Sequence, residues 1–316
     1  MSRITTLGEL LVDLTQRGVD EQGNGKFIAF PGGAPANVSV AAARLGAKTA
    51  FIGKVGNDAF GKSLRNTLIE EGVDISGLYD SDKVPTTLAV VAVDDKGERE
   101  FAFYRSPGAD TQLTTEEAIA ALEGNLPDIL HIGSLSMTTD PARTACESAV
   151  RYARDRGVLI SYDPNYRAAL WDSEEHAVEM MKALLPLADI LKVSDEEMVM
   201  LTGTSDVAEG SRILEEYGIR LVLVTLGADG VFARSGDFAE AVPGFSVKVA
   251  DTNGAGDTFF GAMLAQIAAR SGIDGLGADE LRKMVVYANK AASLTCSRPG
   301  AMPAMPTAKE VEESLR

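Results

Sequence analysis

Cysteine and histidine are nearly absent from this sequence. It holds two cysteines, Cys146 and Cys296, and two histidines, His131 and His176, among 316 residues. They lie far apart, and no CxxC or mixed Cys/His spacing typical of a metal site occurs. We therefore expect no zinc site, and we expect each cysteine to be a small buried apolar residue.

Basic residues are too few to balance the acidic ones. The chain has 30 Lys and Arg against 46 Asp and Glu, so its formal net charge at pH 7 is −16. Such a charge repels nucleic-acid backbones and anionic lipids, so neither nucleic acid nor a membrane is an expected partner. It also opposes ATP, and any ATP site would need backbone amides, a helix N-terminus or bound cations to attract the phosphates.

Apolar runs long enough to span a bilayer are missing. Residues 1–4 lead straight into a strand-like run and lack the basic and apolar regions of a signal peptide, so we expect a cytoplasmic protein. Hydrophobic residues at 45% and charged residues at 24% are ordinary for a globular chain. Repeats, low-complexity tracts and linkers are missing too, which predicts one domain over residues 1–316.

Short apolar runs alternate with amphipathic stretches along most of the chain. The runs are four to six residues long and rich in Ile, Leu and Val, as buried parallel strands are. The alternation predicts an α/β fold with a doubly wound, mostly parallel sheet and helices on both faces. The strand-like runs are 129–132, 158–162, 190–193 and 221–226, and the helix-like segments are 141–156, 173–184 and 206–217.

Residues 86–105 interrupt this alternation. Two strand-like runs, 87–93 and 100–104, are joined by Asp-Asp-Lys-Gly at 94–97, which is a turn typical of a hairpin. Residues 10–30 are also polar and glycine-rich. We expect the two segments, about 10–30 and 86–106, to form a small β-sheet that projects from the main domain as a lid. If the exposed face of residues 87–104 is apolar, two copies would pair through their lids as a homodimer.

The segment Asp-Thr-Asn-Gly-Ala-Gly-Asp at 251–257 lies between a strand-like run, 245–250, and an apolar helix. Gly254 and Gly256 allow backbone N–H groups to point at an anion, and the helix dipole adds to the attraction. Asp257 falls in the first helical turn, where a carboxylate can accept the proton of an attacking hydroxyl. The alternative is a tight turn with Asp257 as a helix cap.

A second glycine-rich segment, 30–37, precedes a predicted helix at 38–45. Gly32 and Gly33 allow a ligand to approach the backbone closely, and Asn37 carries both a donor and an acceptor. The alternative is a helix start with Asn37 capping it locally.

Together the two segments resemble the N- and C-terminal signatures of the ribokinase/PfkB family of carbohydrate kinases, in the expected order. The resemblance covers nearly the whole chain. Within the family, the stretches 51–56, 97–105 and 161–171 are most similar to the fructokinases.

The resemblance implies a catalytic site and a sugar site. Asp257 would deprotonate the primary hydroxyl of the sugar, and the backbone amides of Gly254, Ala255 and Gly256 would form the anion hole. The residues expected to contact the sugar are Asp13, Gly32, Gly33, Asn37, Arg167 and, from the lid, Arg105. For Asp13 the alternative is a solvated strand end, and for Arg105 it is a surface salt bridge.

The resemblance also implies ATP as the phosphoryl donor. The residues expected to bind it are Thr225, Gly227 and Gly230 in a glycine-rich turn, Asn289 at the adenine pocket, and Asn165 and Lys192 near the phosphates. Ser194 and Glu197 stand where the family has an Asn-x-x-Glu motif that organises Mg²⁺ through water. Many members are activated by K⁺, for which Asp251 and Asn253 would be ligands together with carbonyls from 295–300. At Asn253 the family commonly has Thr.

A competing motif lies at 56–63, where Gly-Asn-Asp-Ala-Phe-Gly-Lys-Ser matches the P-loop pattern GxxxxGK[ST]. A P-loop would make Lys62 the phosphate ligand. We reject this interpretation because the family signature already accounts for Gly56, and because Asp58 is typical of a helix N-cap. A carboxylate inside a phosphate cradle is also electrostatically unfavourable. Lys62 is therefore expected to be a solvated helix residue.

These inferences predict an enzyme that phosphorylates a sugar with ATP, with D-fructose as acceptor and D-fructose 6-phosphate as product. A 2-keto-3-deoxygluconate kinase of the same family is an alternative, since Tyr104, Arg105 and Arg167 could bind a carboxylate. A nucleoside kinase is disfavoured because the lid lacks added aromatic residues that would stack on a base. The alternative of another class is a non-catalytic sugar-sensing protein on a kinase fold, against which the intact Asp257 and its glycine pair argue.

Overall fold

The computed structural model describes residues 3–93 and 99–316. Its main sheet has nine strands in the order β13-β12-β11-β10-β9-β8-β1-β4-β5. All neighbouring pairs from β11 to β5 are parallel, and β12 and β13 are added antiparallel at one edge. The strands are β1 (Arg3–Leu7), β4 (Lys48–Gly56), β5 (Asp74–Ser81), β8 (Ile129–Gly133), β9 (Leu159–Asp163), β10 (Ile190–Ser194), β11 (Leu221–Thr225), β12 (Val231–Ser235) and β13 (Phe238–Val242).

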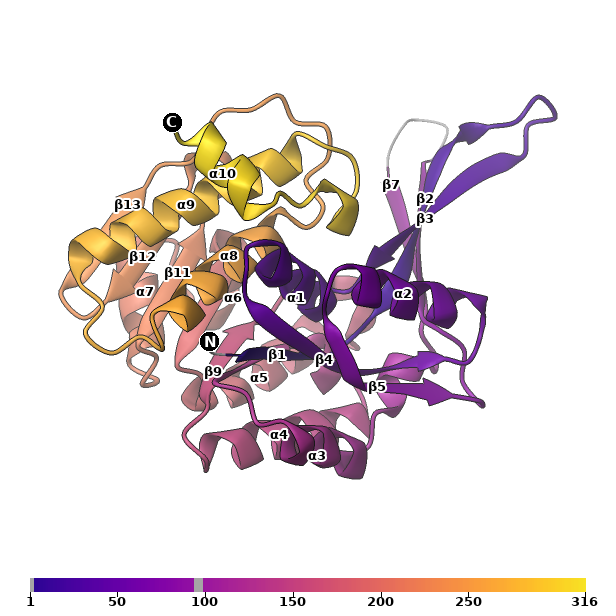
Figure 1. Ribbon diagram of the computed structural model, residues 1–316, viewed down its shortest axis with the longest axis horizontal. Helices are drawn as coiled ribbons and strands as arrows, with labels where there is room; N and C mark the ends of the chain where they lie inside the picture. Colours follow the sequence, from indigo (N-terminus) through magenta and orange to yellow (C-terminus); the bar gives the residue numbers. More distant parts are fainter. Residues whose placement is uncertain (1–2, 94–98) are drawn as a thin grey trace.

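Helices cover both faces of this sheet (Figure 1). Apolar side chains of α1, α8 and α9 form one core layer, and those of α3 to α7 form the layer on the opposite face. The helices are α1 (Ala34–Arg44), α2 (Ala59–Glu70), α3 (Thr115–Gly124), α4 (Ala142–Arg154), α5 (Glu174–Leu184), α6 (Asp195–Thr202), α7 (Val207–Glu215), α8 (Ala255–Ala269), α9 (Ala278–Cys296) and α10 (Ala308–Ser314). The doubly wound α/β prediction is confirmed. None of the helices in the described ranges is long and apolar enough to cross a membrane.

The chain leaves β1 toward β4 and β5 on one side of the sheet and later returns to β8 on the other side. The point between β1 and β8 is therefore a topological switch point. In open parallel sheets, ligands bind beyond the carboxyl ends of the strands at such a point.

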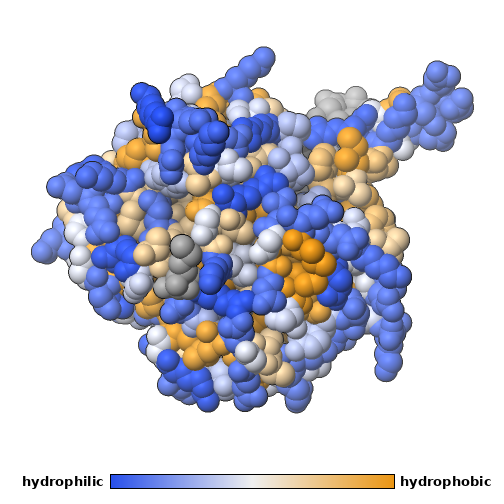
Figure 2. Space-filling view, viewed as in Figure 1, coloured by the Kyte–Doolittle hydropathy of each residue, from blue (hydrophilic) through white to orange (hydrophobic). Residues whose placement is uncertain are grey.

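The predicted lid forms a separate four-stranded sheet in the order β3-β2-β6-β7. Its strands are β2 (Leu11–Val19), β3 (Gly25–Gly32), β6 (Leu88–Val93) and β7 (Arg99–Tyr104). Two antiparallel hairpins are joined by the parallel pair β2–β6, and the sheet projects from the main body (Figure 1). The turn predicted at 94–97 lies outside the described residues. Hydrophilic side chains cover the outer end of the β2–β3 hairpin (Figure 2).

One predicted strand is wrong. Residues 245–250 belong to no strand and run as a loop from the end of β13 to α8. Pro243 cannot donate a backbone hydrogen bond to a neighbouring strand. The Ala250 N–H donates to the carbonyl oxygen of Cys296 at the end of α9, 2.8 Å away, so this loop is held by a helix end and not by the sheet.

Candidate active site

The segment 251–257 enters α8 from that loop. Gly254 is the residue before the helix and has φ 74°, a left-handed conformation that favours glycine. A Cβ on Gly254 would lie 2.8 Å from the Cβ of Ala301, so a larger residue is also excluded by contact. Beyond it, Ala255 and Gly256 lie in the first helical turn, whose N–H groups have no partner within the helix. The Ala255 N–H donates a long hydrogen bond of 3.3 Å to the Thr252 carbonyl oxygen. The predicted anion hole therefore rests on a loop-to-helix junction, and not on the strand-to-helix junction expected from the sequence.

Asp257 contacts the other glycine-rich segment. The Asn37 side-chain amide donates a hydrogen bond of 2.8 Å to Asp257 Oδ2. Asn37 lies inside the first turn of α1, which begins at Ala34 and not at residue 38 as predicted. Its Oδ1 is buried and has no hydrogen-bond partner among the described residues. Neither side chain is the local helix cap considered from the sequence. Asn37 on α1 and Asp257 on α8 instead bond to each other.

Burial raises the pKa of Asp257 above the ordinary value of an aspartate. The hydrogen bond from Asn37 and the positive charges of Lys192 and Arg167 act in the opposite direction. A carboxylate with a raised pKa is a stronger general base. The hydrogen bond from Asn37 also fixes the orientation of the Asp257 carboxylate.

A cavity of ≈ 410 Å³ opens beside Asp257. Strands of the lid form one wall through Leu11, Ala89, Val91 and Phe103. Most of the residues predicted to bind sugar line this cavity, together with Asn165, which was expected near the phosphates. The predicted site residues along it are Asp13, Gly33, Asn37, Asn165, Arg167, Asn253, Gly254 and Asp257. We call this cavity the sugar pocket, after the ligand that the sequence predicts for these residues.

Asp13 brings a second acidic group into the sugar pocket. Burial raises its pKa to about 6, with Arg167 acting to lower it and Asp257 and Asp251 acting to raise it. A Cβ on Gly32 would lie 2.3 Å from Asp13 Oδ2. Gly32 therefore does not line the pocket, and its lack of a side chain makes room for the Asp13 carboxylate.

Arg105, expected to contact the sugar, does not line the sugar pocket. Its guanidinium is buried and donates to Asp110 Oδ2 at 2.7 Å, to Thr138 Oγ1 at 2.8 Å and to the Leu135 carbonyl oxygen at 2.9 Å. Asp110 also accepts a hydrogen bond from Thr87 at the start of the second lid hairpin. The Arg105–Asp110 pair thus anchors both ends of this hairpin, and it is a buried pair, not the surface salt bridge considered as the alternative.

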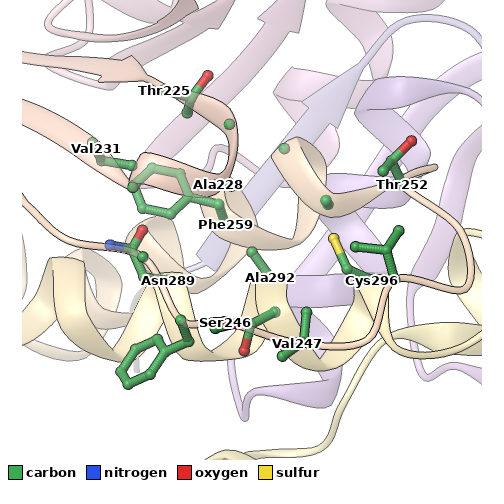
Figure 3. Close-up of a pocket in the computed structure, with 18 residues that line it drawn as sticks. Thr225, Ala228, Val231, Ser246, Val247, Thr252, Phe259, Asn289, Ala292 and Cys296 are labelled. Carbon is green, nitrogen blue, oxygen red and sulfur yellow. The ribbon is translucent and has the colours of Figure 1, made fainter.

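The second pocket, of ≈ 380 Å³, lies on the other side of the anion hole and has mostly apolar walls (Figure 3). Most of the predicted nucleotide residues line it: Thr225, Gly227, Gly230 and Asn289, with Ala255 and Gly256 at the shared wall. We call it the nucleotide pocket, after the ligand that the sequence predicts for these residues. Cys296 also lines it and is only partly buried, whereas Cys146 is fully buried as expected.

Asn289 lines the nucleotide pocket and is hydrogen-bonded to the loop that forms one of its walls. Its side-chain amide donates to the carbonyl oxygens of Val242 at 3.2 Å and Pro243 at 3.1 Å. These residues begin the loop that closes the pocket, so Asn289 positions this wall from α9. A Cβ on Gly230 would lie 2.2 Å from the Val242 carbonyl oxygen, so this close approach requires glycine.

Lys192 lines neither pocket but lies directly behind Gly256 of the predicted anion hole. Its ammonium is 3.2 Å from the position that a Cβ on Gly256 would occupy. It pairs with Asp163 Oδ2 at 2.9 Å, and both side chains are buried. The carboxylates of Asp163, Glu197 and Asp257 raise the pKa of Lys192 against the effect of burial, so it remains charged.

Ser194 and Glu197 form a capping box at the start of α6. Glu197 accepts backbone hydrogen bonds from Tyr166 and Ser194, each of 2.7 Å. Each carboxylate oxygen therefore already accepts one backbone hydrogen bond, which suits contact between Glu197 and Mg²⁺ through intervening water. Within residues 3–93 and 99–316, no group of three or more His, Cys, Asp or Glu side chains could hold a metal. A magnesium ion would be held mainly by nucleotide phosphates and water.

The residues expected at a K⁺ site are brought together. Asp251 is buried, and its carboxylate accepts the N–H groups of Asn253 and Gly300, each at 3.2 Å. The loops 251–253 and 295–300 thus lie side by side and offer carboxylate and carbonyl oxygens, a donor set that suits a hard cation. Arg17, on the lid strand β2, lies 3.6 Å from Asp251 Oδ2 and places a further positive charge there.

Two residues of the site were missed from the sequence. Glu9 follows β1 and lines the sugar pocket, and Asp163 ends β9 beneath Lys192. Both stand at carboxyl ends of parallel strands, which is the one signal that could have identified them. Glu9 accepts the Ala34 N–H at 2.9 Å, and burial raises its pKa to about 7.

The P-loop motif has a structural role. Asp58 caps α2, accepting the Gly61 N–H at 2.8 Å, and its second oxygen accepts the Thr86 N–H at 2.8 Å. A carboxylate of the chain itself thus occupies the place where a P-loop would bind phosphate. Lys62 is exposed, and no residue of 56–63 lines either pocket.

A doubly wound sheet with a separate lid sheet, and an acid between a pocket that carries several charged and amide side chains and a mostly apolar pocket, is the arrangement of a ribokinase-like small-molecule kinase. The chain belongs to the pfkB family of carbohydrate kinases, whose family model matches residues 1–308.

Three relatives illustrate this membership. Fructokinase-1 of Zea mays is 40% identical over 314 residues, covering 98% of this chain and 96% of that protein. The fructokinase of Xylella fastidiosa, solved with bound ATP, superposes with a TM-score of 0.89 at 33% identity over 99% of both chains. That of Vibrio cholerae O395, solved with fructose, ADP and calcium, gives 0.88 at 34% identity over 100% of this chain and 99% of the other. A double mutant of it was solved with fructose, ADP and potassium.

Proposed function

We propose that this protein is a fructokinase, which transfers the γ-phosphoryl group of ATP to the primary hydroxyl of D-fructose. One observation carries the proposal. In four consecutive residues, Gly254 and Asp257 line the sugar pocket, while Ala255 and Gly256 line the nucleotide pocket. The base and the anion hole therefore stand at the wall between an acceptor site and a donor site, as in-line phosphoryl transfer requires.

Each group then has a chemical role. The sugar hydroxyl gives its proton to Asp257 as its oxygen bonds to the γ-phosphorus, and the bond from phosphorus to the bridging oxygen breaks to release ADP. Backbone amides at 254–256 stabilise the charge on the transferring group, and Lys192 adds positive potential from behind. The proton on Asp257 later passes to solvent. Mg²⁺ bound with the nucleotide would neutralise part of the phosphate charge. K⁺ beside Asp251 would add a further positive charge near the phosphates.

The lid supports a reaction that must exclude water. Leu11, Ala89, Val91 and Phe103 give the sugar pocket an apolar wall opposite its polar groups. When a sugar fills the pocket, this wall displaces water that would otherwise compete with the hydroxyl for the phosphoryl group.

The polar groups of the sugar pocket favour a neutral polyol over a sugar acid. Of the three residues that could bind a carboxylate, Tyr104 is 65% exposed and Arg105 is paired with Asp110. Only Arg167 lines the pocket, and there it lies near the acidic Asp13 and Asp257. Carboxylate and amide groups bind hydroxyls well but repel or bind weakly a second carboxylate. The 2-keto-3-deoxygluconate alternative is therefore disfavoured.

A substrate panel tests this function. The purified protein is assayed for ADP release with ATP, Mg²⁺ and each of D-fructose, other free hexoses, D-ribose and 2-keto-3-deoxygluconate, with and without K⁺. Fructose is expected to give the highest kcat/KM. Faster turnover of the sugar acid would overturn the choice of substrate, and tight binding of fructose without ADP release would indicate a sugar sensor.

Replacing the base tests the mechanism. Asp257→Asn keeps the shape of the side chain but cannot accept the proton, so kcat should fall by about 10²–10⁴-fold, while binding of fructose changes little. A variant that retains turnover within tenfold would refute the assignment of the base.

We place the reaction in the cytoplasm, where ATP is available, and we propose that two copies pair through their lids. Val19, Phe27, Ile28 and Tyr104 are large side chains of the lid that are between 46% and 65% exposed. Phe27 and Ile28 are consecutive on β3 and therefore face opposite sides of the lid sheet, and Tyr104 is on the opposite edge strand, β7. Exposed apolar and aromatic side chains on a projecting sheet support pairing with a second such sheet.

A further inference from the structure

Asp163 is a buried carboxylate between the two pockets. It ends β9, and its side chain is 2% exposed. Its two oxygens have different partners: Oδ2 pairs with the Lys192 ammonium at 2.9 Å, and Oδ1 accepts the Asn165 N–H at 3.1 Å. One carboxyl group therefore holds two separate parts of the active site.

Through Lys192, Asp163 is connected to the wall of the nucleotide pocket. Lys192 lies behind Gly256, whose missing side chain leaves room for the ammonium 3.2 Å from the place of a Cβ. The Lys192 stem is flexible in isolation, and within the described residues Asp163 is the acidic side chain that forms an ion pair with it. Removing this carboxylate would leave the ammonium free to turn away from the anion hole.

The Asn165 side leads to the sugar. Asn165 has φ 47°, a left-handed conformation that is uncommon for non-glycine residues, that asparagine adopts more readily than most, and that a local hydrogen bond further stabilises. The bond to Asp163 supplies this support. Asn165, Arg167, Ala168 and Ala169 all line the sugar pocket, so the turn at Asn165 sets how this segment faces the sugar.

We propose that Asp163 is a positioning residue that couples the two substrate sites, with one oxygen fixing Lys192 behind the anion hole and the other fixing the Asn165 turn beside the sugar. The proposal rests on the proposed function, since it assigns a nucleotide and a sugar to the two pockets. Asp163 itself lines neither pocket and is not a catalytic residue.

Two substitutions distinguish the roles of the two Asp163 oxygens. In Asp163→Asn the amide oxygen can still accept the Asn165 N–H, but the charge that holds Lys192 is lost. kcat should fall by about 10–100-fold with the KM for fructose within about twofold of wild type. Asp163→Ala removes both bonds, so it should show the same loss of kcat and, in addition, a rise of about tenfold in the KM for fructose. Equal values of this KM in the two variants would overturn the role at the sugar site.

A double-mutant cycle tests the role at the anion hole. Lys192→Met should lower kcat to the same extent as Asp163→Asn, and the double variant should be no worse than either single one. Independent losses that multiply would show that Asp163 does not act through Lys192 and would overturn the proposal.

A matched control comes from another Lys–carboxylate pair. Glu117 on α3 pairs with Lys54 on β4 at 2.7 Å, and neither residue lines the sugar pocket or the nucleotide pocket. Glu117→Gln removes one charge from a similar pair and should leave kcat and both KM values unchanged. Thermal unfolding of every variant separates loss of activity from loss of fold. The Asn and Met variants test the proposal even if Asp163→Ala does not fold.

Calorimetry distinguishes this proposal from the proposed function. Dissociation constants are measured for fructose, for the best sugar of the panel and for a non-hydrolysable ATP analogue. If the wild type does not phosphorylate fructose, the proposed function fails. The proposal for Asp163 can still hold in that case: if the Asn165 turn depends on Oδ1, Asp163→Asn and Asp163→Ala bind sugar with different affinities. Equal affinities for every sugar that the wild type binds would overturn the coupling.

Discussion

Glu9 offers a test in which a single buried charge changes stability with pH. Its side chain is buried beside the sugar pocket, with Oε1 accepting the Ala34 N–H at 2.9 Å. Oε2 is buried and has no hydrogen-bond partner among the described residues. Burial raises the pKa of Glu9 from 4.5 to about 7, against the effects of its own backbone N–H and of Arg105. Asp110 adds to the rise.

The magnitude follows from the two pKa values. A difference of about 2.5 between the folded and unfolded pKa corresponds to about 3 kcal/mol. Between pH 4.5 and pH 7 the folded protein binds more protons than the unfolded chain, so this group lowers the free energy of unfolding as pH rises. The stability associated with neutral Glu9 is present below pH 4.5 and is lost above pH 7.

Glu9→Gln removes this dependence, because glutamine is neutral at every pH and can still accept the Ala34 N–H. The free energy of unfolding of the variant minus that of wild type should increase by about 3 kcal/mol between pH 4.5 and pH 8. Urea unfolding of both proteins, without sugar or nucleotide, measures the difference at each pH, and taking the difference removes the effect of all other titrating groups.

The control is Glu123→Gln, which changes an exposed glutamate on α3. It should leave the pH dependence of stability as in wild type, since a solvated carboxylate loses no hydration on folding. If the free energies of unfolding of Glu9→Gln and wild type differ by the same amount at pH 4.5 and at pH 8, the inference that folding buries the Glu9 carboxyl group is refuted.

Three further predictions concern the rejected motif, the nucleotide wall and the lid. Lys62→Ala should leave turnover within about twofold, since Lys62 is exposed and Asp58 occupies the P-loop position; a collapse of kcat would restore the P-loop. Asn289→Ala should raise the KM for ATP by about tenfold without changing that for fructose, because the bonds to Val242 and Pro243 are lost; a change only in the fructose KM would contradict this. Ile28→Lys should convert a lid-paired dimer to monomers in sedimentation measurements, with wild-type turnover per chain as the sign of an intact fold; an unchanged mass would exclude pairing through this face.

Much of the fold follows from local sequence. Buried parallel strands are continuous Ile/Leu/Val runs because both faces are covered, and β8, β9, β10 and β11 coincide with such runs within one or two residues. The exception is 245–250, where an apolar run was read as a strand. Its apolar side chains face the nucleotide pocket and not the sheet, and a pattern of hydrophobicity does not distinguish these two kinds of burial.

The sequence by itself determined the family, the two glycine-rich segments and Asp257, because backbone conformation at Gly254 and Gly33 requires glycine and leaves a visible motif. Tertiary structure alone decided the partners of the charged side chains. Arg105 pairs with Asp110, Asp163 with Lys192, and Glu9 lies buried without a charge partner in hydrogen-bond contact. Arg105 and Asp110 are only five positions apart, but Leu135 and Thr138, which accept the other hydrogen bonds of Arg105, are 30 and 33 positions away. Lys192 and Asp163 lie 29 positions apart on neighbouring strands. Such long-range contacts depend on how the strands are ordered in the sheet, and no local spacing encodes that order.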